Sequence, residues 1–169
     1  MDAVTLLFAL KQREEEITKD LLLPTKPQKG SDSEERPIKI YNQRLPDEAS
    51  SVKQAPYKLN AVLTGTFGRE PGEAPEDRVI IRSVLCVYAP DSETGAMNLL
   101  NVMERIRIDY EKNPILDNTF ELDLAKKIQT IVYPDDTAPY YMGEMVTEWM
   151  LPPVEREGWK TWLRQSQSP

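Results

Sequence analysis

The feature that most constrains the fold is a pair of β-type segments separated by a long polar insertion. Residues 56–67 (PYKLNAVLTGTF) alternate between apolar and polar side chains, as a half-buried strand does. The apolar positions on one face are Tyr57, Leu59, Ala61 and Leu63. Residues 78–89 (RVIIRSVLCVYA) are apolar on nearly both faces, which is typical of a central strand. We therefore expect a hairpin whose second strand lies inside a sheet.

The insertion between these strands, residues 65–78 (GTFGREPGEAPEDR), contains three glycines, two prolines and six charges. Connections between elements have a median of about 4–6 residues, and longer ones often carry function. We expect a protruding hairpin arm here. The sequence GTFGREPG lacks the Gly-Lys-Ser/Thr ending of a phosphate loop and does not join a strand to a helix, so phosphate binding is disfavoured.

Two amphipathic helices are expected. Residues 2–22 begin at Asp2, a good N-cap, and end before Pro24, and the acidic run 14–16 is expected to face solvent. Residues 91–112 begin at Asp91, Ser92 or Thr94 and end at Asn113-Pro114. The predicted buried stripe of this second helix is Leu99, Val102, Met103, Ile106 and Tyr110.

The remaining segments complete a helix–hairpin–helix–hairpin order. We expect mostly flexible loop over 24–55, with a short edge strand at 37–45. A second hairpin is expected where residues 120–132 and 140–151 flank the Asp-rich turn YPDDTAP. These elements predict one domain over 1–156 and a C-terminal tail over 157–169.

The composition narrows the function. The 169 residues include no histidine and one cysteine, Cys86, which removes Ser-His-Asp and Cys-His catalysis. The net charge of −7 disfavours non-specific binding to nucleic acid. A lone cysteine in an apolar run is expected to be buried, and it suits folding in a reducing compartment. Because no apolar run approaches about 20 residues, we expect no membrane span. A binding, structural or assembly protein is favoured over an enzyme.

Two pairs of acidic residues have the chemistry of a metal or catalytic site. Asp135 and Asp136 carry oxygen ligands for a hard cation, but turn chemistry explains them better. Glu144 and Glu148 share one strand face, as glycosidase carboxylates can, but two glutamates on the water side of a strand explain them better.

The tryptophans divide into two groups. Trp149 is expected in the core, because it falls at strand spacing with other apolar residues. Trp159 and Trp162 lie beyond the predicted sheet, and we expect them to contact the domain or another subunit.

Three phrases and the order of elements resemble a known family. The phrases are APYKLNAVLTGTFGRE, RVIIRSVLCVYAPDSETGAMNLLNVMERIRIDYEKNPIL and IVYPDDTAPYYMGEMVTEWMLPPVERE. With the helix at 2–22 before them, they resemble the tail-completion and tail-terminator proteins of long-tailed bacteriophages and prophages. The resemblance covers residues 2–156.

The resemblance implies an α+β fold with a curved, mainly antiparallel sheet, and no enzymatic activity, metal or cofactor. It implies a homo-oligomeric ring, typically a hexamer, at the tail–head junction of the virion, assembled in the host cytoplasm. The implied partners are the tail-tube protein and a head-connector or neck protein, with DNA passing through the lumen. An acidic ring would let DNA slide, because it repels phosphates. On this reading the arm contacts the tube or the adjacent subunit through Arg69, Glu70, Glu73, Glu76, Asp77 and Arg78.

Three alternatives stay open. The first is another neck component, such as a head-closure or head–tail adaptor protein. The second is a small carboxylate-dependent hydrolase built around Glu144, Glu148 and the Asp135-Asp136 turn. The third is a monomeric interaction module that docks through Trp159 and Trp162.

Overall fold

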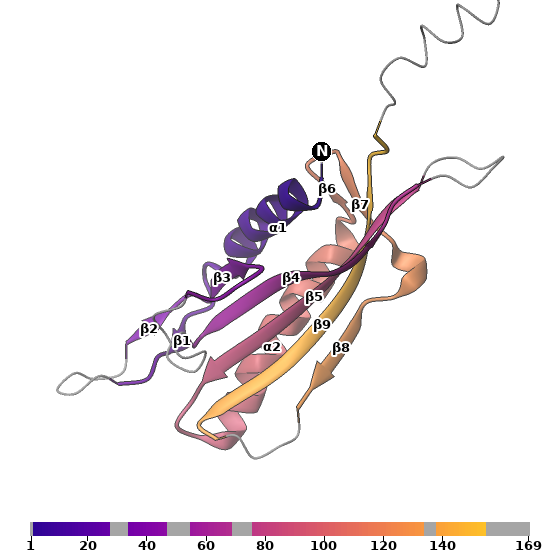
Figure 1. The fold of residues 1–169 in the computed structure, drawn as a ribbon. Coiled ribbons are helices and arrows are strands. Elements are labelled where there is room, and N and C mark those ends of the chain that lie inside the picture. The colour runs from indigo at the N-terminus through magenta and orange to yellow at the C-terminus, as the bar shows by residue number, and fades with distance from the viewer. Residues whose placement is uncertain (1, 28–33, 47–54, 69–75, 134–137, 155–169) are drawn as a thin grey trace, which may run out of the picture.

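The computed structural model describes residues 2–27, 34–46, 55–68, 76–133 and 138–154. Within them, two helices pack on a curved, mainly antiparallel sheet, which confirms the α+β class (Figure 1). The helices are α1 (Ala3–Thr18) and α2 (Ser92–Lys112). The larger sheet contains β3 (Lys39–Asn42), β4 (Tyr57–Thr66), β5 (Asp77–Tyr88), β6 (Ile115–Leu116), β7 (Phe120–Leu122), β8 (Gln129–Val132) and β9 (Tyr140–Leu151).

Strand β5 is central, as its two apolar faces predicted. The sheet order is β3-β4-β5-β9-β7-β6, and β8 pairs with another stretch of β9. The β4–β5 hairpin runs from Tyr57 opposite Cys86 to Thr66 opposite Arg78, with an irregularity between Val62 and Thr64. All twelve residues of β5 pair with β9. The second expected hairpin is confirmed in part, because β8 and β9 pair antiparallel, whereas residues 120–128 form β7 and a 3-10 turn at Leu124–Lys126 instead of continuing β8.

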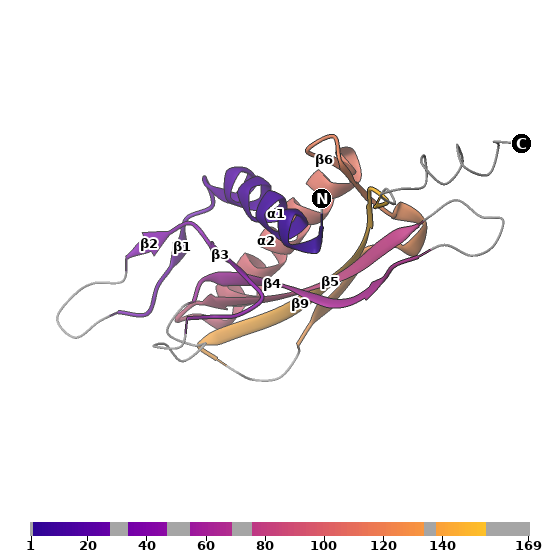
Figure 2. The same ribbon diagram turned by 45° about the horizontal axis from the view of Figure 1, so that its top comes forward.

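The helices cover one face of the sheet (Figure 2). The predicted stripe of α2 faces this core, and Asp91 caps the helix by accepting a hydrogen bond from the Thr94 amide. Trp149 is fully buried, as expected, and its ring meets the Tyr110 ring edge-on at 5.4 Å between centroids. The other face of the sheet carries no helix in the described part of the chain.

Two expectations for the N-terminal third are corrected. Asp2 caps α1 as predicted, but the helix ends at Thr18 rather than at 22, because Leu23 leaves it to bury its side chain in the core. The segment 24–55 is loop over most of its described residues, as expected, but it also contains a strand pairing that the sequence did not predict. There, β1 (Leu23–Pro24) and β2 (Glu35–Arg36) pair as a two-stranded ribbon, and β3 forms the expected edge strand. Strand β3 runs parallel to β4, which the sequence did not predict.

The faces of β4 are also corrected. Lys58 and Asn60 were placed on the polar face, yet they are 1% and 0% exposed and lie beneath α1. Tyr57 and Leu59 point to the opposite side of the sheet, where Tyr57 and Cys86 belong to a smaller apolar cluster. The helix-facing side of β4 is therefore polar, and α1 must supply partners for it.

Candidate assembly surfaces

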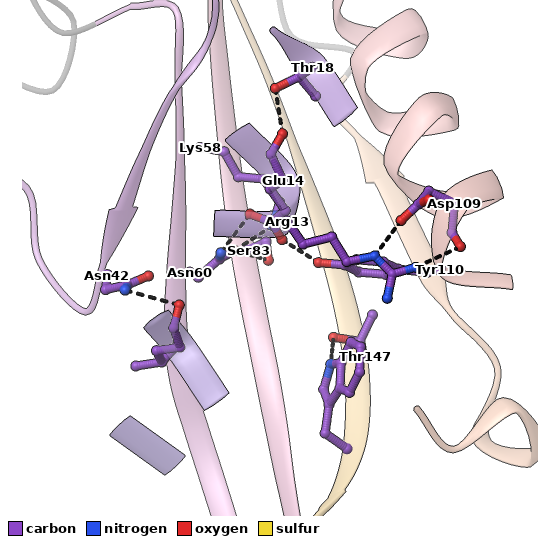
Figure 3. Close-up of polar contacts among 12 residues, drawn as sticks. Arg13, Glu14, Thr18, Asn42, Lys58, Asn60, Ser83, Asp109, Tyr110 and Thr147 are labelled. Atoms are coloured by element: carbon purple, nitrogen blue, oxygen red, sulfur yellow. Dashed lines mark hydrogen bonds and ion pairs between the residues drawn. The ribbon is translucent and has the colours of Figure 1, made fainter. Parts of the chain in front are cut away.

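A buried polar network joins α1 to the sheet (Figure 3). Glu14, expected in solvent, is fully buried and accepts hydrogen bonds from three side chains. Lys58 Nζ lies 2.6 Å from Glu14 Oε1, Asn60 Nδ2 lies 2.7 Å from Oε2, and the Tyr110 hydroxyl also donates to Oε1. Ser83 donates to Asn60 Oδ1 at 2.7 Å. These contacts satisfy the buried charges and fix the position of α1.

Burial sets the electrostatics of this network. It lowers the pKa of Lys58, while the nearby Glu14 carboxylate opposes the shift. Burial also raises the pKa of Tyr110 well above its ordinary value, and Glu14 adds to that rise. Beside the network, Arg13 Nε donates to Asp109 Oδ2 at 2.6 Å and links α1 to α2. Because Glu14, Lys58, Asn60 and Tyr110 are all at most 2% exposed, the network holds the fold together and offers no group to a ligand.

The base of the hairpin arm is a second polar cluster, and it lies at the surface. Arg78 contacts Glu76 at 3.0 Å, Glu148 at 3.1 Å, and Asp123. The backbone closes the base as well, since Glu76 N donates to Gly68 O at 3.3 Å and Gly68 N donates to Asp77 Oδ1 at 3.2 Å.

This arrangement corrects part of the predicted arm. Asp77 and Arg78 belong to β5, and their side chains secure the arm's base rather than extend from it. The hydrogen bonds that Arg78 donates to Asp123 and Glu76 raise the pKa of Arg78, and they lower the pKa of Asp123. Arg69, Glu70 and Glu73 lie outside the described residues.

The helix-free face of the sheet holds the two glutamates considered for catalysis. Glu144 is largely buried, and Arg82 binds it with two nitrogens, one of them at 2.7 Å. The Tyr133 hydroxyl donates to the same carboxylate. Glu148 contacts Arg78. Both glutamates lie on the side of β9 opposite the main core, as expected, but Glu144 is buried and does not lie in water, and each glutamate forms an ion pair with an arginine of β5.

Among the described residues, no group of three or more Cys, Asp or Glu side chains is arranged to hold a metal ion. Asp135 and Asp136 lie outside those residues.

The same face carries an aromatic cluster at the other end of the strands. Cys86 is buried there, as expected, with Ala55 and Tyr57. Half-buried side chains pack around them: Tyr41, Leu45, Leu59, Tyr88, Tyr140 and Met142. The rings of Tyr88 and Tyr140 are 5.5 Å apart. The alternation in 56–67 correctly predicted that Tyr57 and Leu59 share a face. It did not predict that this face belongs to the smaller cluster rather than to the main core beneath the helices.

Strand β8 forms an exposed edge of the sheet. Its residues and the following Tyr133 are all exposed, including Ile131 at 46% and Val132 at 40%. The sequence predicted the strand but not its exposed edge, because apolar strand residues such as Ile131 and Val132 are usually buried. Trp159 and Trp162, the predicted interface aromatics, lie outside the described residues.

Neither described helix is long and apolar enough to cross a membrane. No protein-family model matches the chain, and no curated protein matches it.

Proposed function

We propose that this protein is a non-enzymatic virion assembly protein that caps a phage tail tube as a ring. In this role it stops tube polymerisation and presents a docking surface to the head connector. Its partners are further copies of the chain, the tail-tube protein and a neck protein, and DNA passes through the ring without specific binding. Its place is the tail–head junction of the virion.

The observation that carries the proposal is the anchored hairpin arm. An arm that contacts another subunit binds more tightly if its base is rigid, because less conformational freedom is then lost on binding. Here the two strands that lead into it are ten and twelve residues long, and Arg78 ties their end to Glu148 on β9 and to Asp123. Figure 1 shows these strands extending beyond the helices at one end of the sheet. This geometry suits contact with a tube or an adjacent subunit.

Two further features support the same role. A ring needs heterologous contacts, in which different surfaces of one subunit meet. The chain offers different exposed features on different sides, namely the arm base and the uncharged edge of β8. The net charge of −7 suits a lumen through which DNA must slide.

Shortening the arm tests the proposal. Because Glu76 N donates to Gly68 O, a two-residue Asn-Gly turn can replace residues 69–75 and close the hairpin without disturbing the strands. We expect a folded protein that no longer caps tubes, so that cells making it accumulate overlong, headless tails in electron micrographs. The matched control keeps the arm's length but removes its charge, with Arg69→Ser, Glu70→Gln and Glu73→Gln.

The outcomes separate the alternatives. Tails of normal length joined to heads would contradict an arm contact that is needed for capping. Tails of normal length beside heads that leak DNA would favour a head-closure protein instead. If the shortened variant loses capping and the uncharged variant keeps it, capping depends on the length of the arm and not on its charge.

A further inference from the structure

The outer edge of β8 has free backbone hydrogen-bonding groups. Tyr133 N donates to Met142 O, and antiparallel pairs alternate, so residues 129 and 131 also bond inward to β9. The amides and carbonyls of Thr130 and Val132 therefore point away from the sheet. No described strand pairs with this edge.

The side chains of β8 leave that edge unprotected. Proteins usually guard an exposed edge with charge, proline or a bulge. The stretch from Gln129 to Tyr133 has none of these, and its Ile131, Val132 and Tyr133 side chains are 46%, 40% and 38% exposed. A strand from another chain could bond to Thr130 and Val132 and cover these apolar groups.

The ribbon of β1 and β2 has a matching free edge on the opposite side of the molecule. Thr25 N donates to Glu34 O, so by the same alternation the backbone groups of Glu35 point away from β1. No described strand pairs with that side of β2. Both views place the ribbon at one side of the sheet and β8 at the other (Figures 1 and 2).

The carboxylates on the ribbon and the ammonium groups before β8 have opposite charge, and the ribbon segment also carries exposed Lys26 and half-buried Arg36. Exposed Glu34 and Glu35 lie on the ribbon, and exposed Lys126 and Lys127 precede β8. None of the four forms an ion pair within the described part of the chain. Opposite charges at two distant surfaces favour head-to-tail contact between copies over self-pairing of either surface.

We propose that the β1–β2 ribbon of one copy adds to the β8 edge of the next copy, and that this contact closes the ring. The occupant of the edge is a second copy of this chain, with Glu34 and Glu35 placed near Lys126 and Lys127. The inference rests on the proposed function, because it names the subunit contact of that ring.

Disulfide trapping between two variants tests the contact. Glu35→Cys and Thr130→Cys are made separately, mixed at high concentration with and without tail tubes, and oxidised. Because the two cysteines are on different chains, any heterodimer reports contact between copies. Burial raises the pKa of the native Cys86 thiol to about 11, so it competes little. The control mixes Glu35→Cys with Glu104→Cys, an exposed position on α2.

We expect a disulfide heterodimer from the first mixture and not from the control. The variant carrying both cysteines should give a series of disulfide-linked oligomers on a non-reducing gel, and the largest should contain as many subunits as the ring. Wild-type protein that sediments as a ring or caps tubes, while the first mixture crosslinks no better than the control, would overturn the pairing and leave the proposed function intact. Wild-type protein that neither forms rings nor caps tubes would overturn both.

A charge exchange gives an independent readout. Lys126→Glu with Lys127→Glu should raise the concentration needed for half-assembly by about tenfold or more, because like charges then face each other. Adding Glu34→Lys and Glu35→Lys to the same chain should restore assembly. Failure of the second pair to rescue the first would overturn the placement of these charges, and retained far-UV circular dichroism excludes unfolding as the cause.

Discussion

Replacing Lys58 with methionine should destabilise the fold far more than replacing any surface lysine. Methionine keeps most of the aliphatic volume but removes the ammonium that lies 2.6 Å from the fully buried Glu14 carboxylate. Removing one partner of a buried pair costs about 3–5 kcal/mol, since the other charge stays buried without compensation. At about 2–4 °C per kcal/mol for a chain of this size, the midpoint should fall by about 6–20 °C.

The assays are thermal unfolding, which gives the midpoint temperature, and urea unfolding, which gives the free energy of unfolding, both followed by far-UV circular dichroism. An unchanged urea m-value shows that the variants unfold in the same transition. The matched control is Lys11→Met, which breaks the exposed Lys11–Glu15 pair at 3.7 Å and should cost less than about 1 kcal/mol. The double variant Glu14→Gln, Lys58→Met removes both charges and keeps an acceptor for Tyr110, so it should recover at least half of the loss. A Lys58→Met cost no larger than the control, or a double variant as unstable as the sum of the singles, would refute this reasoning.

Two further predictions concern buried positions. Because burial raises the Cys86 pKa from 9.0 to about 11, the folded thiol keeps a proton that the unfolded thiol releases. Wild-type stability should therefore fall by about 2–3 kcal/mol relative to Cys86→Ala as pH rises from 8 to 11, measured by urea unfolding, and parallel pH profiles would contradict the shift. Gly143→Ala should lower the free energy of unfolding by about 1–3 kcal/mol in the same assay, because the added Cβ would lie 2.9 Å from Ile131 O and 3.0 Å from Met103 Sδ. Unchanged stability would show that β8 moves aside to accommodate the added methyl group.

Local patterns predicted the elements whose burial follows from their own sequence. The apolar character of 78–89 identified a central strand, and helical spacing identified the buried face of α2. Asp2 and Asp91 were recognised as caps because capping depends on residues within one turn. Cys86 and Trp149 were expected in apolar clusters, and both are buried.

The errors occur where a partner lies far away in the chain. Glu14 and Lys58 read as surface residues, and their burial depends on a pairing across 44 positions that no periodicity reveals. The ribbon was missed for a similar reason, because Leu23 and Arg36 pair across residues with the composition of a loop. The β4–β5 hairpin was predicted correctly, but the role of Arg78 needed Asp123 and Glu148, which come from later segments.

The position of β9 bears on how the protein is made. It is the last strand of the described chain, yet it lies between β5 on one side and β7 and β8 on the other. During synthesis, β8 therefore has no strand to pair with, and the core beneath α2 is incomplete, until residues 140–151 emerge from the ribosome. A product that stops before Tyr140 has no strand to hold β8 in register. Such a fragment would lack the edge that another subunit is proposed to recognise, so incomplete chains would be unable to join the proposed ring.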